Sequence, residues 1–436
     1  MTPPPNFLFF LPDQHRFDWV PWNDRLPVKM PTLERLAAQG VRFIKAITPS
    51  PLCAPARACL ASGKSYGRCG VRNNADDYPL DQPTYYRALR DAGYRVGGVG
   101  KFDLAKGTHD WQFEGKRLLP EWGFTDGIDS EGKMDAINSY VRRDPPRTPK
   151  GPYMSYLQGR GLADTHADDF LARRGRGTDP TPLPDDAYCD NWIARNGADC
   201  LRAFPKDQPW HLVVNFNGPH SPFDVTADMR RAWADTSFPP PVANTDDMSP
   251  AQHQAIRQNY AAMIENIDRC MGELIDIVRE RGELERTVIV YSSDHGEMLG
   301  DHDRWGKSIY YQPSVGVPLA VSGYGISDRV AGTRSDALVS LHDVNATFRE
   351  LAGAPPLPGV DGQSLVPLLR GERATVREFA HSALEDWRMV WDGRYKLVRH
   401  DDNTLLFDLD DDPDETRDLT DARPDEVARL APELAA

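Results

Sequence analysis

Short apolar runs separated by helical stretches restrict the fold of this chain more than any other feature. Runs with little polar alternation are typical of strands buried on both faces of a parallel sheet. They are Phe7–Leu11, Arg95–Gly100, His211–Phe216, Thr287–Tyr291 and Pro318–Val321. Since helical stretches lie between them, the pattern predicts an α/β sandwich with helices on both faces of the sheet.

The clearest predicted helix covers about residues 254–281. Its apolar residues recur at spacings of three and four, which is typical of a helix with one face in the core. These residues are Tyr260, Met263, Ile264, Ile267, Met271, Leu274, Ile275 and Val278. Two shorter helices are predicted at Thr32–Gln39 and Thr84–Ala92, and each stops at a glycine, Gly40 or Gly93.

The chain is long enough for one large domain and a smaller one. We expect an α/β catalytic domain over residues 1–370, with a Pro-, Gly-, Arg- and Asp-rich insertion at about 143–186. Residues 371–436 are expected to form a subdomain with an antiparallel sheet and a helix. Its strands are predicted at 387–391, 395–398 and 404–407, and Asp392-Gly393 is a hairpin turn signal between the first two.

Charge and composition argue against several classes of protein. The formal net charge is −14 without a basic tract, so nucleic acid is a poor partner. The sequence contains no run of 18 apolar residues, so no membrane span is predicted. The six cysteines lack C-x-x-C spacing, which argues against a zinc knuckle or a dithiol redox motif. Because no signal peptide is visible, we expect a cytoplasmic protein; a secreted or periplasmic one is the alternative if a signal was removed. A homo-oligomer is left open.

Polar residues follow two of the predicted strands. Asp13 and Gln14 come after the first run, and Asp294 and His295 come shortly after Thr287–Tyr291. Ligands of open α/β sheets gather at the carboxyl ends of the strands. One acidic residue at such a place is commonly a turn or helix cap. Two strand ends that carry such residues, together with Cys53, are a stronger signal. Their side chains could hold one divalent cation next to a nucleophile.

Five segments resemble the type I sulfatases, which belong to the alkaline phosphatase-like superfamily. Cys53, Pro55 and Arg57 resemble the maturation signature of that family. Segment 293–307 resembles its second signature, 216–223 its histidine-bearing segment, Gly100-Lys101 its Gly-Lys segment and 406–419 its closing hairpin. The matches occur in family order along nearly the whole chain. The pair Asp294-His295 and Gln14 resemble the choline-sulfatase and phosphonate monoester hydrolase branches.

The resemblance implies a large mixed, mostly parallel sheet and a set of site residues. Cys53 would be oxidised to formylglycine, the nucleophile, by a maturation enzyme of the host. One divalent metal is implied, with Ca²⁺ expected ahead of Mn²⁺ or Mg²⁺. The implied metal ligands are Asp13, Gln14, Asp294, His295 and residue 53. Arg57 would stabilise the nucleophile, Lys101 and Lys307 would bind sulfate oxygens, and His220 would contact the substrate and protonate the leaving oxygen.

One position departs from the family pattern. The usual Gly-Lys-x-His reads Gly100-Lys101-Phe102-Asp103 here, so an imidazole is replaced by a carboxylate. Asp103 could act as a base, bind a substrate hydroxyl or cation, or point away. His109 could take over from the missing histidine, but we expect it to be a surface histidine. Asn74 is a further candidate for contact with the substrate, with a loop turn as the alternative.

Three functions follow. The first is hydrolysis of a small-molecule or carbohydrate sulfate ester. The second is hydrolysis of a phosphonate monoester or phosphodiester with the same nucleophile and metal. The third is a catalytically inactive binding homologue, against which the intact Cys53, Arg57, Asp294 and Lys307 argue.

Overall fold

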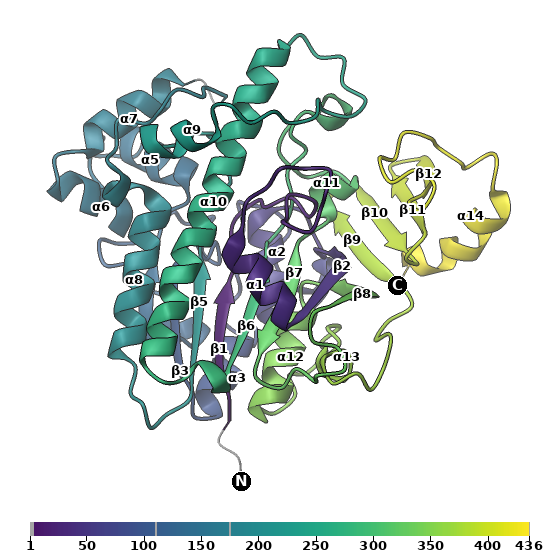
Figure 1. Ribbon diagram of the computed structural model, residues 1–436, viewed down its shortest axis with the longest axis horizontal. Coiled ribbons are helices and arrows are strands. Elements are labelled where there is room, and N and C mark those ends of the chain that lie inside the picture. Colours follow the sequence, from purple (N-terminus) through teal and green to yellow (C-terminus); the bar gives the residue numbers. More distant parts are fainter. Residues whose placement is uncertain (1–3, 110, 174–175, 436) are drawn as a thin grey trace.

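The computed structural model describes residues 4–109, 111–173 and 176–435, and its core is an eight-stranded sheet (Figure 1). The strand order is β4-β3-β5-β1-β6-β7-β2-β8. The strands are β1 Asn6–Phe10, β2 Val41–Ile47, β3 Arg95–Gly100, β4 Asp126–Asp129, β5 Trp210–Asn215, β6 Thr287–Ser292, β7 Leu319–Gly323 and β8 Thr333–Ser340. The predicted α/β class with a mixed, mostly parallel sheet is therefore confirmed.

Strand β1 lies in the middle of the sheet and is buried on both faces. Leu8 and Phe10 belong to one hydrophobic core, and Phe7 and Phe9 to a second core on the other face. This alternation follows from the two-residue period of a strand. The chain therefore needs helices on both sides, and α8 and α10 pack together on one side while α2, α3 and α12 pack on the other.

The three predicted helices correspond to α1, α3 and α10, and the described residues form further helices that the sequence analysis did not predict. The helices are α1 Pro31–Gln39, α2 Cys53–Ser62, α3 Tyr85–Asp91, α4 Leu119–Trp122, α5 Lys133–Arg142, α6 Pro152–Gly159, α7 Ala163–Ala172, α8 Cys189–Ala203, α9 Ala227–Trp233, α10 Pro250–Glu280, α11 Gln312–Val315, α12 Asp343–Ala352, α13 Val366–Leu369 and α14 Pro424–Leu430. The long helix α10 begins with a capping box formed by Ser249 and Gln252. Within the described residues, no helix is both long and apolar enough to cross a bilayer.

Strand β7 corrects one expectation, because Pro318–Val321 was predicted as a parallel strand. β7 pairs antiparallel with both β6 and β2. A connection between parallel strands must carry the chain back to the end of the sheet at which the first strand began, usually through a helix. Between β6 and β7 the chain has only two short helical segments, a 3₁₀ turn at Asp301–Asp303 and helix α11, and it enters β7 from the end of the sheet at which β6 stops. β7 therefore runs in the opposite direction to β6.

The second sheet is antiparallel, in the order β12-β11-β10-β9. Its strands are β9 Ala380–Leu384, β10 Trp387–Trp391, β11 Tyr395–His400 and β12 Asn403–Asp408. Its aromatic residues, among them Trp387 and Phe407, pack against Met298 and Ile309 of the loop between β6 and β7. This sheet therefore supports the loop that carries Lys307. The domain boundary at residue 370 stays a prediction.

The segment predicted as an insertion, 143–186, contains two of the helices. Helices α6 and α7 pack on each other and on α5. Tyr153 and Leu157 of α6 are buried in the same core as α10. The segment is thus a helical cover anchored by apolar contacts, although its status as an insertion stays a prediction.

Candidate active site and metal centre

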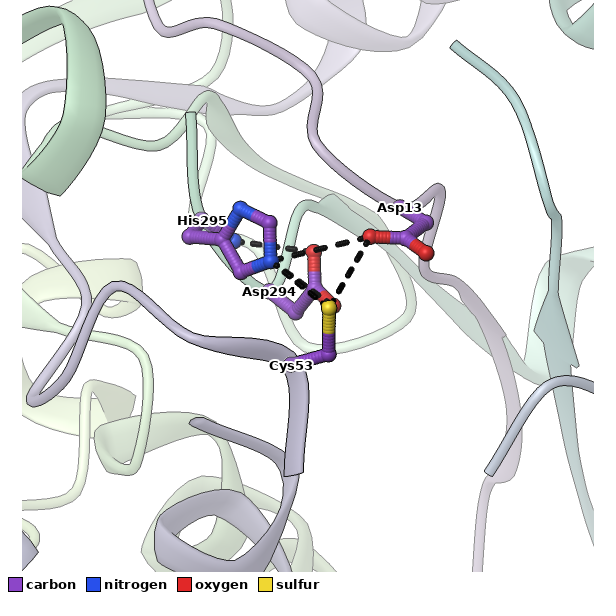
Figure 2. A group of neighbouring side chains, drawn as sticks. All are labelled: Asp13, Cys53, Asp294 and His295. Carbon is purple, nitrogen blue, oxygen red and sulfur yellow. Dashed lines mark hydrogen bonds and ion pairs between the residues drawn. The ribbon is translucent and has the colours of Figure 1, made fainter. Parts of the chain in front are cut away.

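Three segments far apart in the sequence meet at the carboxyl edge of the large sheet (Figure 2). Asp13 follows β1, Asp294 and His295 follow β6, and Cys53 is the first residue of α2. One ligand atom from each of the four lies within 4.8 Å of the others. All four residues are at most 1% exposed, so the ends of β1 and β6 meet at Cys53, and the roles of the four residues stay predictions.

Cys53 lies at the centre of this group. Its Sγ is 3.3 Å from Nε2 of His295 and 3.9 Å from Oδ1 of Asp13. Burial and the Asp13 carboxylate raise the pKa of the thiol, but Lys101 and Lys307 outweigh them and hold the pKa of Cys53 well below its usual value. The first turn of a helix also favours negative charge. The position therefore stabilises an anionic atom at residue 53.

The pKa values of Asp13, Asp294 and His295 are shifted in different directions. Burial would raise the pKa of Asp13, yet the Lys101 ammonium lowers that pKa well below its usual range. For Asp294, burial and the nearby Asp13 raise the pKa. Burial would lower the pKa of His295, but Asp294 raises it. The two carboxylates therefore differ, because the lysine stabilises the charged form of Asp13, whereas burial and Asp13 disfavour the charge on Asp294.

The donor set fits a divalent metal ion. Two carboxylates, an imidazole and the residue-53 position are converging, buried ligands, and buried carboxylates normally need a partner cation. Oxygen ligands suit Ca²⁺, Mg²⁺ and Mn²⁺, and an imidazole is compatible with Mn²⁺. Asp13, Asp294 and His295 would therefore hold the ion together with residue 53.

Gln14, predicted as a further ligand, lies beside this group. Its backbone N–H donates to Oδ1 of Asp294 at 3.0 Å. Its carboxamide NH₂ donates to Glu297, and its carboxamide oxygen accepts from Lys307. Both ends of the side chain are engaged by the protein, and ligation by Gln14 stays a prediction.

Arg57 lies one helical turn after Cys53 and points to the same edge. Its Nε donates to Oδ2 of Asp294 at 2.9 Å, and its Nη1 donates to Oδ1 of Asn215 at 3.1 Å. Its Nη2 is buried and has no partner among the described residues. A buried guanidinium nitrogen without a partner is costly, so it is a donor available to a bound anion.

Three further predicted residues surround the nucleophile position. The Lys101 ammonium forms ion pairs with Asp13 and, at 2.9 Å, with Asp103. Lys307 Nζ lies 2.8 Å from Nε2 of His220. The other ring nitrogen of His220 faces the carbonyl oxygen of Ser221, which makes Nδ1 the protonated nitrogen and leaves Nε2 to accept from the lysine.

The remaining candidates have different environments. Asn74 Oδ1 accepts from the Ala54 backbone N–H at 3.0 Å and so fixes the start of α2. Asp103 is buried between Lys101 and Lys106, and the distance to Lys106 Nζ is 2.8 Å. His109 does not contact Cys53; its Nε2 lies 3.4 Å from Asp135. The structure therefore gives no support to His109 as the substitute for the missing histidine.

Sequence reasoning gave no role to Glu297, although it lies within the segment 293–307. Its Oε1 accepts from the backbone N–H groups of Leu299 and Gly306, at 3.0 and 2.6 Å. Its Oε2 accepts from Gln14. Glu297 therefore fixes both Gln14 and the loop that ends in Lys307, an arrangement that only the folded loop makes visible.

We predict that Glu297→Gln lowers kcat/KM about 10–100-fold, as is typical for residues that orient a metal site. A carboxamide cannot accept all three of these hydrogen bonds. The matched control is Glu285→Gln, because Glu285 is exposed and lies in the turn before β6. This variant should leave kcat/KM unchanged. Equal kinetics for both variants would contradict this role.

This fold and this centre define a hydrolase of the alkaline phosphatase-like class. The sulfatase family profile matches residues 5–354, and the N-sulphoglucosamine sulphohydrolase C-terminal profile matches residues 300–435. The chain therefore belongs to the sulfatase family. Choline-sulfatase from Rhizobium meliloti (strain 1021) is 28% identical to it over 457 residues, which cover 96% of this chain and 83% of the relative.

Solved structures agree on the fold. Phosphonate monoester hydrolase from Agrobacterium radiobacter superposes with a TM-score of 0.81 at 22% identity, covering 98% of this chain and 94% of that one. A protein solved in complex with its substrate D-glucosamine-2-N,6-O-disulfate superposes with a TM-score of 0.76 at 20% identity, covering 99% and 96%. The likeness extends over the small C-terminal sheet as well as the large one.

Proposed function

We propose that this protein hydrolyses a sulfate ester with a formylglycine nucleophile made from Cys53 and one divalent metal ion. The observation that carries the proposal is the position of Cys53. It is the buried first residue of a helix, among Asp13, Asp294 and His295. Membership of the sulfatase family supports the reaction class.

The residues around Cys53 suit a tetrahedral anion. A hydrated formylglycine supplies two hydroxyls on one carbon, one to attack sulfur and one to release sulfate. Arg57 offers its unpartnered Nη2 to the oxygens of the substrate, while Lys101 and Lys307 supply positive charge. These fixed charges stabilise the charge that develops in the transition state.

A bound metal ion would lower the pKa of the attacking hydroxyl and neutralise substrate charge. Asp13, Asp294 and His295 would hold it, with Ca²⁺ proposed ahead of Mn²⁺ or Mg²⁺. Departure of the alcohol needs a proton. His220 and Lys307 form a donor–acceptor pair, so a proton can pass from Lys307 to Nε2 of His220 and then to the leaving oxygen.

The substrate class proposed is a small-molecule or carbohydrate sulfate ester. The choline-sulfatase relative and the structural neighbour bound to a sulfated glucosamine support this choice. The second candidate function is hydrolysis of a phosphonate monoester or phosphodiester. The pairing of Asp294 with His295 and the carboxylate of Asp103 at the usual histidine position favour it. A host maturation enzyme is the proposed partner in making the nucleophile.

The test is a comparison of kcat/KM for an aryl sulfate, an aryl phosphonate monoester and a phosphodiester. The intact mass of the peptide containing residue 53 is measured in the same preparation. We expect a formylglycine mass and the highest kcat/KM for the sulfate. A higher value for the phosphonate or the diester would favour the second function. Absence of turnover for all three esters in protein with formylglycine would contradict both.

A further inference from the structure

A row of buried alternating charges leads away from the candidate metal centre. Asp103 Oδ2 lies 2.9 Å from Lys101 Nζ and 2.8 Å from Lys106 Nζ. Lys106 Nζ in turn lies 2.6 Å from Asp135 Oδ2. The Asp103 side chain is 1% exposed and that of Lys106 is 8% exposed. The mechanism above uses only Lys101 from this row.

The Asp103 carboxylate forms ion pairs with two lysines through one of its oxygens. Both ammonium groups contact the same oxygen, Oδ2, while Oδ1 is buried with no partner among the described residues. The backbone of Asp103 has a φ of +53°, which is uncommon for a residue with a side chain. In this conformation the Asp103 carboxylate is a fixed negative charge beside the Lys101 ammonium.

The charges in the row cancel. Lys101 and Lys106 carry two positive charges, and Asp103 and Asp135 carry two negative charges. In a buried setting such charges are weakly screened and act over several ångströms. A bound anion therefore meets Lys101 with its charge largely offset, whereas a neutral histidine at position 103 would have left Lys101 with the Asp13 ion pair but without that of Asp103.

We propose that Asp103 and Lys106 set the charge class of the substrate, so that the site accepts singly charged esters and disfavours doubly charged ones. This inference rests on the proposed function and deepens it. Sulfate monoesters, phosphonate monoesters and phosphodiesters each carry one negative charge. A phosphate monoester carries nearly two at neutral pH, because its second pKa is about 6. Asp103 and Lys106 are then specificity-determining residues that act through Lys101.

The test measures binding of two unreactive tetrahedral anions by calorimetry at pH 8.5. Methanesulfonate carries one negative charge, and inorganic phosphate carries two. The ratio of their dissociation constants gives the charge preference without any turnover. Asp103→Asn removes a negative charge and should shift the preference toward phosphate by about tenfold. Lys106→Met removes a positive charge and should shift it toward methanesulfonate by a similar factor.

The double variant Asp103→Asn/Lys106→Met restores the balance and should return the ratio to within about threefold of the native value. Lys116→Met, at an exposed position, is the control for the lysine change and should leave the ratio unchanged. Thermal unfolding of each variant checks that it folds. Shifts of both single variants in the same direction, an unchanged ratio, or no binding of either ion to the native protein would overturn the inference. The ester panel above decides the proposed function separately.

Discussion

Cys53→Ala should reduce turnover of the best ester by at least about 10⁴-fold, because loss of a covalent nucleophile removes most of the chemistry. The variant should fold normally. Cys53 is small, and its loss removes one buried sulfur at the start of α2, which costs about 1 kcal/mol or less in the free energy of unfolding. Steady-state rates and thermal unfolding measure the two effects independently.

Cys59→Ala is the matched control for this prediction. Cys59 lies on the same helix and is equally buried, but it belongs to a hydrophobic core cluster that does not include Cys53. Burial raises the pKa of its thiol well above the usual value, so it is a packed, unreactive cysteine. Full activity in Cys53→Ala, or equal losses in both variants, would refute the assignment of the nucleophile.

Asp294→Asn should lower bound metal and turnover together, with at least a tenfold loss of metal affinity. The Oδ2 atom of Asp294 accepts from Arg57 at 2.9 Å, while Oδ1 accepts from the backbone of Gln14 and His295. An amide NH₂ in the Oδ2 position would face the Arg57 donor, so the change removes a ligand charge and also disturbs the arginine.

Elemental analysis of the purified protein gives the metal content, and metal-dependent thermal shifts give the affinity. Asp303→Asn is the control, because Asp303 lies in the loop after Asp294, is exposed and accepts a hydrogen bond from the Thr245 hydroxyl. Unchanged metal content in Asp294→Asn would move the metal site elsewhere. Unchanged turnover with lost metal would show that the reaction needs no metal.

The sequence was most informative where periodicity and burial agree. The runs at residues 7–11, 95–100 and 287–291 match β1, β3 and β6 within one residue at each end, and the long helix was found because its apolar stripe spans many turns. Strand β8 was not predicted, since its first four residues, Thr333–Asp336, are polar and largely exposed. A strand at the edge of a sheet lacks the continuous apolar signal.

Some residues of the candidate site could be placed together from the sequence, and others could not. Asp13, Asp294 and His295 could be brought together from the sequence, because the ends of parallel strands meet at one edge, whereas Cys53 was added to them on its resemblance to the sulfatase maturation signature. The pairing of Asp103 with Lys106 could not be predicted, since it depends on a positive φ at Asp103. The individual catalytic and binding roles stay predictions until the variants are measured.

The central place of β1 has a consequence for how the protein is made. β1 comes before all the other described strands in the chain, yet its neighbours are β5 and β6, and Asn6 pairs with Thr287, about 280 residues later. At roughly 5–20 residues per second, the chain waits between about 15 and 60 seconds before this pairing is available. In the finished fold Cys53 is 1% exposed. The proposed oxidation of Cys53 would therefore need the thiol before the chain has packed around it.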